Sequence, residues 1–182
     1  MKMEQIPTEK FSTEKFSNNQ GFSLIELVIA IAILAIMCVG GMSAMGYLSM
    51  ANSSKCASRI DSSLTVLKSK NSAEARSTYM HLYRYRDRYY VRYSNQPSYT
   101  PDDSNYKEGE EIGNSQITIS YQEGNLSASS VTIQDGDCKT FGIRKKDGAF
   151  TGTMEPTCVI SVIGQSTYKV TLVTNTGKHF RD

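Results

Sequence analysis

The sequence predicts an α+β protein in which one long N-terminal helix, at about residues 22–70, packs on a C-terminal antiparallel β-sheet domain. Three observations predict this architecture. Residues 27–54 carry no acidic or basic side chain, no proline occurs between residues 8 and 96, and from residue 73 onward short runs of β-branched and aromatic residues replace the helical pattern. The first half of the helix is predicted to cross a membrane.

Length and charge narrow the function classes. The chain has 182 residues and a formal net charge of +2, enough for one domain with an appendage. Such a small net charge does not indicate a nucleic-acid binder that acts through bulk charge. The long uncharged window argues against a purely cytosolic enzyme.

The N-terminus changes abruptly from polar to apolar. Residues 1–21 contain three lysines and three glutamates and cannot bury a hydrophobic face, so we expect this leader to be disordered. The apolar run 22–48 exceeds the roughly 7–15 residues of a signal-peptide core and would form a helix of about 40 Å, which can cross a bilayer. Glu26 lies inside it, at a cost of about 2.5–3.5 kcal/mol at mid-membrane depth, and is either functional or a boundary residue that reaches the headgroups.

Residues 21–27, Gly-Phe-Ser-Leu-Ile-Glu-Leu, resemble the processing site of type IV prepilins and the related pseudopilins. The resemblance implies cleavage after Gly21 by a prepilin peptidase on the cytoplasmic side, N-methylation of the new terminus at Phe22, and assembly into a helical filament. It implies as partners other pilin subunits, the peptidase, an inner-membrane assembly platform, and membrane lipid before assembly. The Glu26 carboxylate would then pair with the Phe22 ammonium of a neighbouring subunit.

The implied location is a single-pass prepilin in the cytoplasmic membrane with its head domain outside the cytoplasm, followed by an extracellular filament. The leader is neutral, whereas prepilin leaders are generally basic, so topology rests on the cleavage motif. Element order and the segment Thr176-Gly177-Lys178 also resemble minor pseudopilins of the secretion and FimT-like type.

The resemblance therefore implies a structural subunit, a minor pilin or pseudopilin, and no enzyme. Two alternatives stay open: a competence-type pseudopilin that serves DNA uptake, and a membrane-anchored binding module that never polymerises. The expected organisation is a leader at 1–21, a membrane and filament-core helix at 22–48, an amphipathic half at 49–72 and a β-rich head at 73–182.

The amphipathic half has one apolar stripe. Its members recur at helical spacing and are expected to pack on the sheet: Cys56, Ile60, Leu64 and Leu67. Gly40, Gly41 and Gly46 weaken the helix before it, and mark either a loss of helical regularity or close packing against neighbouring helices.

Strands are expected in seven places of the head domain. They are two within 78–94 that turn near residues 85–88, then 116–122, 130–134, 140–144, 149–153, 158–163 and 168–174. Asp147-Gly148 predicts a hairpin turn, and the proline-containing stretch 95–109 predicts an exposed loop.

The hairpin turn also suggests a disulfide. If Asp147 and Gly148 form its centre, Cys138 comes opposite Thr157, one residue from Cys158. Oxidation after export would then close a loop of about 20 residues and contribute roughly 3 kcal/mol. A link from Cys56 to either partner competes with this pairing.

Arginines and tyrosines alternate in the first two strands. Arg84, Arg86, Arg88 and Arg92 share one parity, and most of the tyrosines share the other. The pattern is best explained if the tyrosines face the core and the arginines face water. The alternative hypothesis is that the arginine face binds DNA or an acidic partner.

No metal site, cofactor or catalytic centre is expected. The acids Asp135 and Asp137, and the group Glu108, Glu110 and Glu111, could ligate calcium but lack the spacing of an EF-hand and fit solvated turns better. No phosphate loop, nucleophile elbow or zinc-protease motif occurs, and the C-x-x-C spacing is absent.

Overall fold

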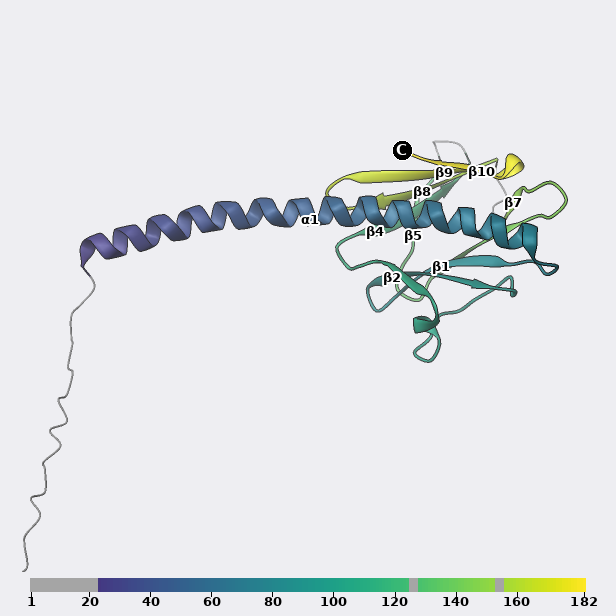
Figure 1. Ribbon diagram of the computed structural model, residues 1–182, viewed down its shortest axis with the longest axis horizontal. Helices are drawn as coiled ribbons and strands as arrows, with labels where there is room; N and C mark the ends of the chain where they lie inside the picture. Colours follow the sequence, from purple (N-terminus) through teal and green to yellow (C-terminus); the bar gives the residue numbers. More distant parts are fainter. Residues whose placement is uncertain (1–22, 125–127, 153–155) are drawn as a thin grey trace, which may run out of the picture. The chain divides into compact units, whose positions relative to one another are not determined.

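The computed structural model describes residues 23–124, 128–152 and 156–182, without the side chains of residues 39–48. The predicted long helix is confirmed: α1 spans Leu24–Ala73, three residues beyond the expected end (Figure 1). The chain divides into two compact units, Met1–Gly40 and Gly41–Asp182. The predicted leader 1–21 lies outside the described residues.

The head domain contains two antiparallel sheets of five strands. The first has the order β3-β2-β1-β6-β7 and the second β10-β9-β8-β4-β5. The strands are β1 (Tyr79–Tyr85), β2 (Arg88–Ser94), β3 (Glu110–Gly113), β4 (Thr118–Glu123), β5 (Val131–Thr132), β6 (Cys138–Ile143), β7 (Phe150–Thr151), β8 (Thr157–Ile163), β9 (Thr167–Val173) and β10 (Lys178–Arg181). Two short 3₁₀ helices, η1 (Tyr106–Glu108) and η2 (Thr174–Thr176), lie in the connections.

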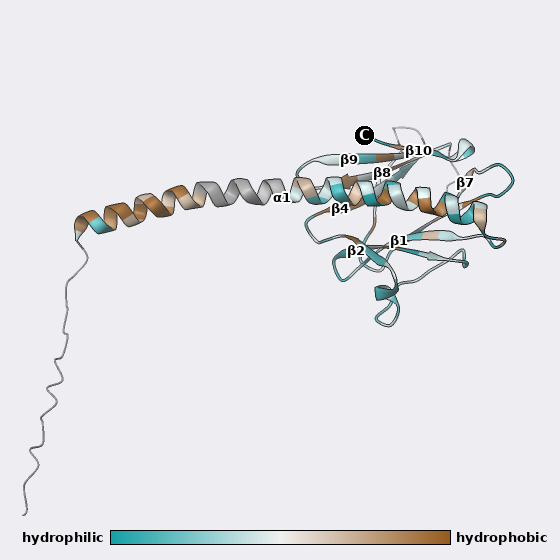
Figure 2. Cartoon of the chain, in the orientation of Figure 1, coloured by the Kyte–Doolittle hydropathy of each residue, from teal (hydrophilic) through white to brown (hydrophobic). Residues whose placement is uncertain are grey.

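The core forms where the C-terminal half of α1 meets the inner faces of both sheets (Figure 1). The predicted stripe is confirmed, since its four residues are 0% exposed. Inward residues of β1, β8 and β9, such as Leu82, Ile160 and Leu172, complete the same cluster. In Figure 2 this half of α1 alternates between hydrophilic and hydrophobic residues, as an amphipathic helix requires.

Polar contacts join the helix and the sheets around this core. The Tyr93 hydroxyl donates to the carbonyl oxygen of Ser63 in α1 at 3.0 Å. The Tyr89 hydroxyl accepts from the Ile119 amide at 3.1 Å and so links the two sheets. Buried Asn71 bonds both backbone groups of Thr78, at 2.7 Å and 3.0 Å, which fixes the chain reversal after α1.

Two strands were not predicted, β3 and β10. The sequence of β3, Glu-Glu-Ile-Gly, is short and acidic, and pairing with β2 alone makes it a strand. Strand β10 follows Gly177, whose left-handed backbone (φ 62°) turns the chain back onto β9. Both strands lie at the edge of a sheet.

The outer face of the first sheet carries a second, smaller cluster. Tyr83, Tyr90 and Tyr106 are buried together, because the loop from 95 to 109 folds over this face. Buried His81 lies on the same face and is hydrogen-bonded through Nδ1 to Thr140 Oγ1 at 2.9 Å and through Nε2 to Ser94 Oγ at 2.8 Å. The loop is thus a packed cover.

We predict that Leu64→Ala lowers the free energy of unfolding by about 2–5 kcal/mol, because the truncation leaves a cavity in the helix–sheet core. Denaturant unfolding followed by tyrosine fluorescence measures the change. Val66→Ala is the control, since Val66 is 40% exposed on the same helix. A cost for Leu64→Ala no larger than for the control would contradict this account of the core.

We also predict that His81 makes the fold sensitive to acid. Burial first, and the charge of Arg92 second, lower the pKa of His81 from 6.5 to about 4. Below pH 6.5, His81 of the unfolded chain binds a proton, whereas His81 of the folded chain stays neutral until about pH 4. The contribution of His81 to stability is therefore present above pH 6.5 and falls by about 3 kcal/mol as the pH drops to 4.

Denaturant titrations at several pH values test this, with His81→Asn as the comparison. The variant should lose stability less steeply between pH 6.5 and 4, by up to one proton's worth of slope. Equal slopes for both proteins would show that His81 does not carry the effect.

Candidate functional site

The first candidate site is the N-terminal segment of α1. Ten large apolar side chains are exposed there, from Leu24 at 83% to Met37 at 68%. Successive residues of a helix point about 100° apart, so these side chains cover every face of it. Figure 2 shows this stretch as hydrophobic apart from one hydrophilic patch. A helix that is apolar all round requires an apolar environment.

Glu26 takes part in the start of this helix. The Ser23 amide donates to Glu26 Oε2 at 3.0 Å, and the Ile25 amide donates to Ser23 Oγ at 3.2 Å. These reciprocal bonds form a capping box, which satisfies two amides that have no partner within the helix. The spacing Ser-x-x-Glu signals this role of Ser23, which was not among the residues predicted from the sequence.

The described residues contain no helix that is both long and apolar enough to cross a membrane. Of the predicted membrane segment 22–48, Phe22 and the side chains of residues 39–48 lie outside the described residues. The predicted processing residues Gly21 and Phe22 lie outside them as well.

The second candidate site is the arginine and tyrosine hairpin formed by β1 and β2. Its turn falls between Tyr85 and Arg88, as predicted. Arg86 and Asp87 form this two-residue turn with φ of 50° and 58°, the left-handed conformation that tight hairpins of the I′ type require. The Arg84 guanidinium closes it with an ion pair to Asp87 at 2.8 Å.

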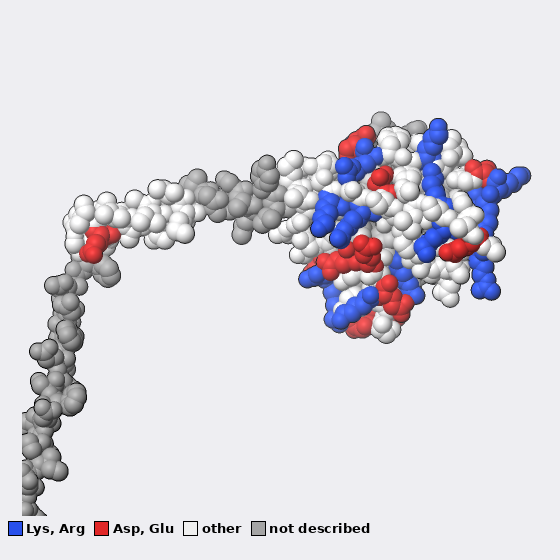
Figure 3. Space-filling model, in the orientation of Figure 1, with Lys and Arg blue, Asp and Glu red and all other residues white. Residues whose placement is uncertain are grey.

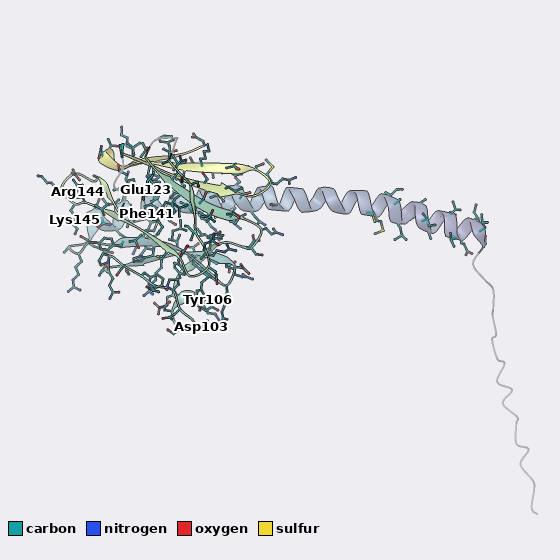
Figure 4. The ribbon with its side chains drawn as sticks, turned by 180° about the vertical axis from the view of Figure 1, so that it is seen from behind. Asp103, Tyr106, Glu123, Phe141, Arg144 and Lys145 are labelled. Atoms are coloured by element: carbon teal, nitrogen blue, oxygen red, sulfur yellow. The ribbon has the colours of Figure 1, made fainter. Side chains whose placement is uncertain are left out.

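Each predicted arginine is paired with an acid. Besides the Arg84 pair, the pairs are Arg86–Asp103 at 2.6 Å, Arg88–Glu111 at 2.8 Å and Arg92–Glu108 at 2.6 Å. Hydrogen bonds from the Tyr85 hydroxyl and Arg86 hold the pKa of Asp103 below its usual value. Figure 4 labels Asp103 beside Tyr106 in the loop that supplies two of these acids. The hairpin is therefore internally neutralised.

The predicted division into a tyrosine face and an arginine face is wrong. Across the turn, Tyr83 pairs with Tyr90, and Arg84 pairs with Tyr89, so each face carries both residue types. Tyr89 points to the main core, whereas Tyr83 lies under the loop. The single-parity pattern fails because a two-residue turn reverses which parity faces the core.

A cavity of about 390 Å³ lies between β2 and the covering loop. Its lining is polar: Arg92, Ser94, Gln96, Ser98, Tyr99, Thr100, Asn105 and Glu108. Arg92 is held by Glu108 and stacks over the Tyr99 ring at 4.8 Å. Both ring nitrogens of neighbouring His81 are already bonded, so this histidine is not poised as a general base.

No disulfide is formed among the four cysteines, all of which are described. The register that suggested Cys138–Cys158 is wrong, because Gly142 pairs with Thr151, two residues away from the partner that a turn centred on Asp147-Gly148 gives, and because β8 lies in the other sheet. Cys138 lies opposite Tyr83, and Cys158 opposite Glu123. Burial raises the pKa of Cys158 to about 12 and that of Cys138 to about 11, which disfavours the reactive thiolate.

Four of the five acids considered for calcium have other partners, since Glu108 and Glu111 pair with arginines and the two aspartates accept backbone hydrogen bonds. Asp137 Oδ2 accepts from the Gln134 amide at 2.9 Å, and Asp135 Oδ1 accepts from the Asp87 amide at 3.3 Å. Within 23–124, 128–152 and 156–182, no three His, Cys, Asp or Glu side chains are placed to hold a metal ion.

Residues 16–42 match the family described as the prokaryotic N-terminal methylation motif. Neither the curated proteins nor the solved structures gave a match. The matched region contains the sequence Gly-Phe-Ser-Leu-Ile-Glu and the exposed apolar start of α1. With an N-terminal helix packed on an antiparallel β-sheet domain, this motif supports a type IV prepilin- or pseudopilin-like protein.

Proposed function

We propose that the chain is a minor pilin or pseudopilin of a type IV pilus or a type II secretion-like filament. It is cleaved after Gly21 by a prepilin peptidase, methylated at Phe22 and assembled through its N-terminal helix. The methylation motif over residues 16–42 is the observation that carries the proposal. The subunit role is structural, and the head domain decorates the filament.

The exposed apolar surface of α1 supports assembly. Leaving a large aliphatic side chain in water forgoes about 1.5–3 kcal/mol relative to full burial. Ten such side chains crowd the residues from Leu24 to Met37. Lipid covers them while segment 22–48 anchors the prepilin in the cytoplasmic membrane, and neighbouring helices cover them in the filament. Lipid and neighbouring helices both shield the same apolar surface from water, so the subunit can pass from the membrane to the filament.

Glu26 supplies specificity in this scheme. It is the only charged side chain between residues 16 and 54, and an acid in a water-poor environment needs a partner. Cleavage after Gly21 creates an ammonium group at Phe22. Pairing between this group and Glu26 of a neighbouring subunit offsets two buried charges and fixes the register of the helices.

Mass spectrometry of the mature protein tests processing. We expect an N-terminus at N-methyl-Phe22 and a chain of 161 residues, which are the 182 of the sequence less the 21 of the leader. An intact leader in the membrane fraction would favour the alternative of a membrane-anchored module that never polymerises.

Substitution of Glu26 tests assembly. Glu26→Ala removes both the charge and the helix cap, whereas Glu26→Gln removes the charge and keeps a side chain that can cap at this position. We expect both variants to be cleaved and both to be absent from filaments, because each lacks the carboxylate that pairs with the ammonium.

Immunoblots of sheared filaments and of membranes give the two readouts. Normal incorporation of Glu26→Gln with loss of Glu26→Ala would reduce Glu26 to a capping residue. Normal incorporation of both would overturn its role in assembly.

A further inference from the structure

The net positive charge of the head domain is concentrated at one end. Six basic side chains gather where α1 ends, on a surface that we call the basic end: Lys70, Arg76, Arg144, Lys145, Lys146 and Lys178. Among the described residues, Glu74 and Asp147 are the only acids of these segments. The other described residues from Lys55 onward hold eleven basic and eleven acidic side chains. The basic end therefore carries the whole net positive charge of the described domain.

Three segments far apart in the sequence build this surface. The Lys145 ammonium donates to the carbonyl oxygens of Glu74 and Ala75, both at 2.6 Å, and thereby fastens the β6–β7 turn to the end of α1. The turn before β10 packs on the same place, since a Cβ at Gly177 would overlap the carbonyl oxygen of Gly148. Figure 4 labels Arg144 and Lys145 together, well away from Asp103 and Tyr106.

The cations of the basic end are largely free to bind. Arg76, Lys146 and Lys178 are exposed, and none forms an ion pair with another described residue. Only Lys70 and Arg144 have acidic partners, at 3.9 Å and 2.9 Å. In Figure 3 basic side chains predominate at the right-hand end of the domain, whereas both signs mix over the loop region below.

This pattern fits a polyanion better than a protein or a membrane. Only two exposed large apolar side chains of the described residues border the basic end, Val66 one turn before Lys70 and Phe180 two residues after Lys178, whereas protein interfaces need an apolar centre. Lys70 lies 21 residues beyond Ser49 along α1, about 30 Å, so a bilayer ending near residue 48 would lie several Debye lengths away.

We propose that the basic end binds the phosphate backbone of double-stranded nucleic acid, without reading its sequence. Lysine ammonium groups act as point charges toward phosphates, and Phe180, two residues beyond Lys178, is the only exposed aromatic ring among the described residues, too few to stack a run of single-stranded bases. The arginine hairpin does not take part, because its guanidinium groups are already paired. Binding is independent of cleavage and of filament assembly.

Fluorescence anisotropy of a labelled 20-base-pair duplex, with the full chain in neutral detergent, tests the proposal. The four cations of the basic end without an acidic partner would each contact one phosphate. This predicts a slope of about −4 for the logarithm of the binding constant against the logarithm of the salt concentration between 50 and 200 mM. Replacing Lys146 and Lys178 together by alanine should weaken binding about tenfold or more at 50 mM salt and reduce the slope by about 2.

Arg86→Ala with Arg88→Ala is the charge-matched control and should leave the affinity unchanged within about twofold. Thermal unfolding of each variant confirms that the fold is intact. Equal losses in both pairs of variants would assign binding to bulk charge, and a loss confined to the arginine pair would assign it to the hairpin. Either result overturns the proposal. A salt dependence with a slope near zero would overturn it as well, and so would binding to phosphatidylglycerol vesicles without binding to the duplex.

Discussion

The burial of one helical stripe holds the head domain together. Cys56, Ile60, Leu64 and Leu67 are fully removed from water in the core that both sheets share. The largest apolar cluster lies on the inner faces of the two sheets, and the helix covers part of both, so neither sheet could bury these residues without it. The N-terminal part of the same helix exposes large apolar side chains from Leu24 to Met37.

The two basic regions of the head domain differ in how their cations are paired. At the hairpin, four arginines form ion pairs with four acids, each within 2.9 Å, so the charges of this region are balanced. At the end of α1, Arg76, Lys146 and Lys178 have no acidic partner among the described residues. Two regions with comparable numbers of cations therefore differ in what they can bind, and the difference lies in where the acids fold.

Much of the architecture could be predicted from the sequence because it depends on local pattern. The stripe in α1, the turn at residues 85–88 and the processing motif each lie within a few residues. The failures involve pairing over distance. Edge strand β3 has little strand character of its own, and the place of Cys158 depended on the chain leaving β7 after two residues.

The sequence by itself determined the long helix, its change from apolar to amphipathic, and the motif that identifies a prepilin-like protein. These are properties of spacing along the chain, and neighbours in sequence decide them. Only the tertiary structure decided that the arginines are paired, that the cysteines of β6 and β8 lie on different sheets, and that cations from three segments share one surface. Charge and thiol chemistry depend on distances in space, which loops and sheet crossings set.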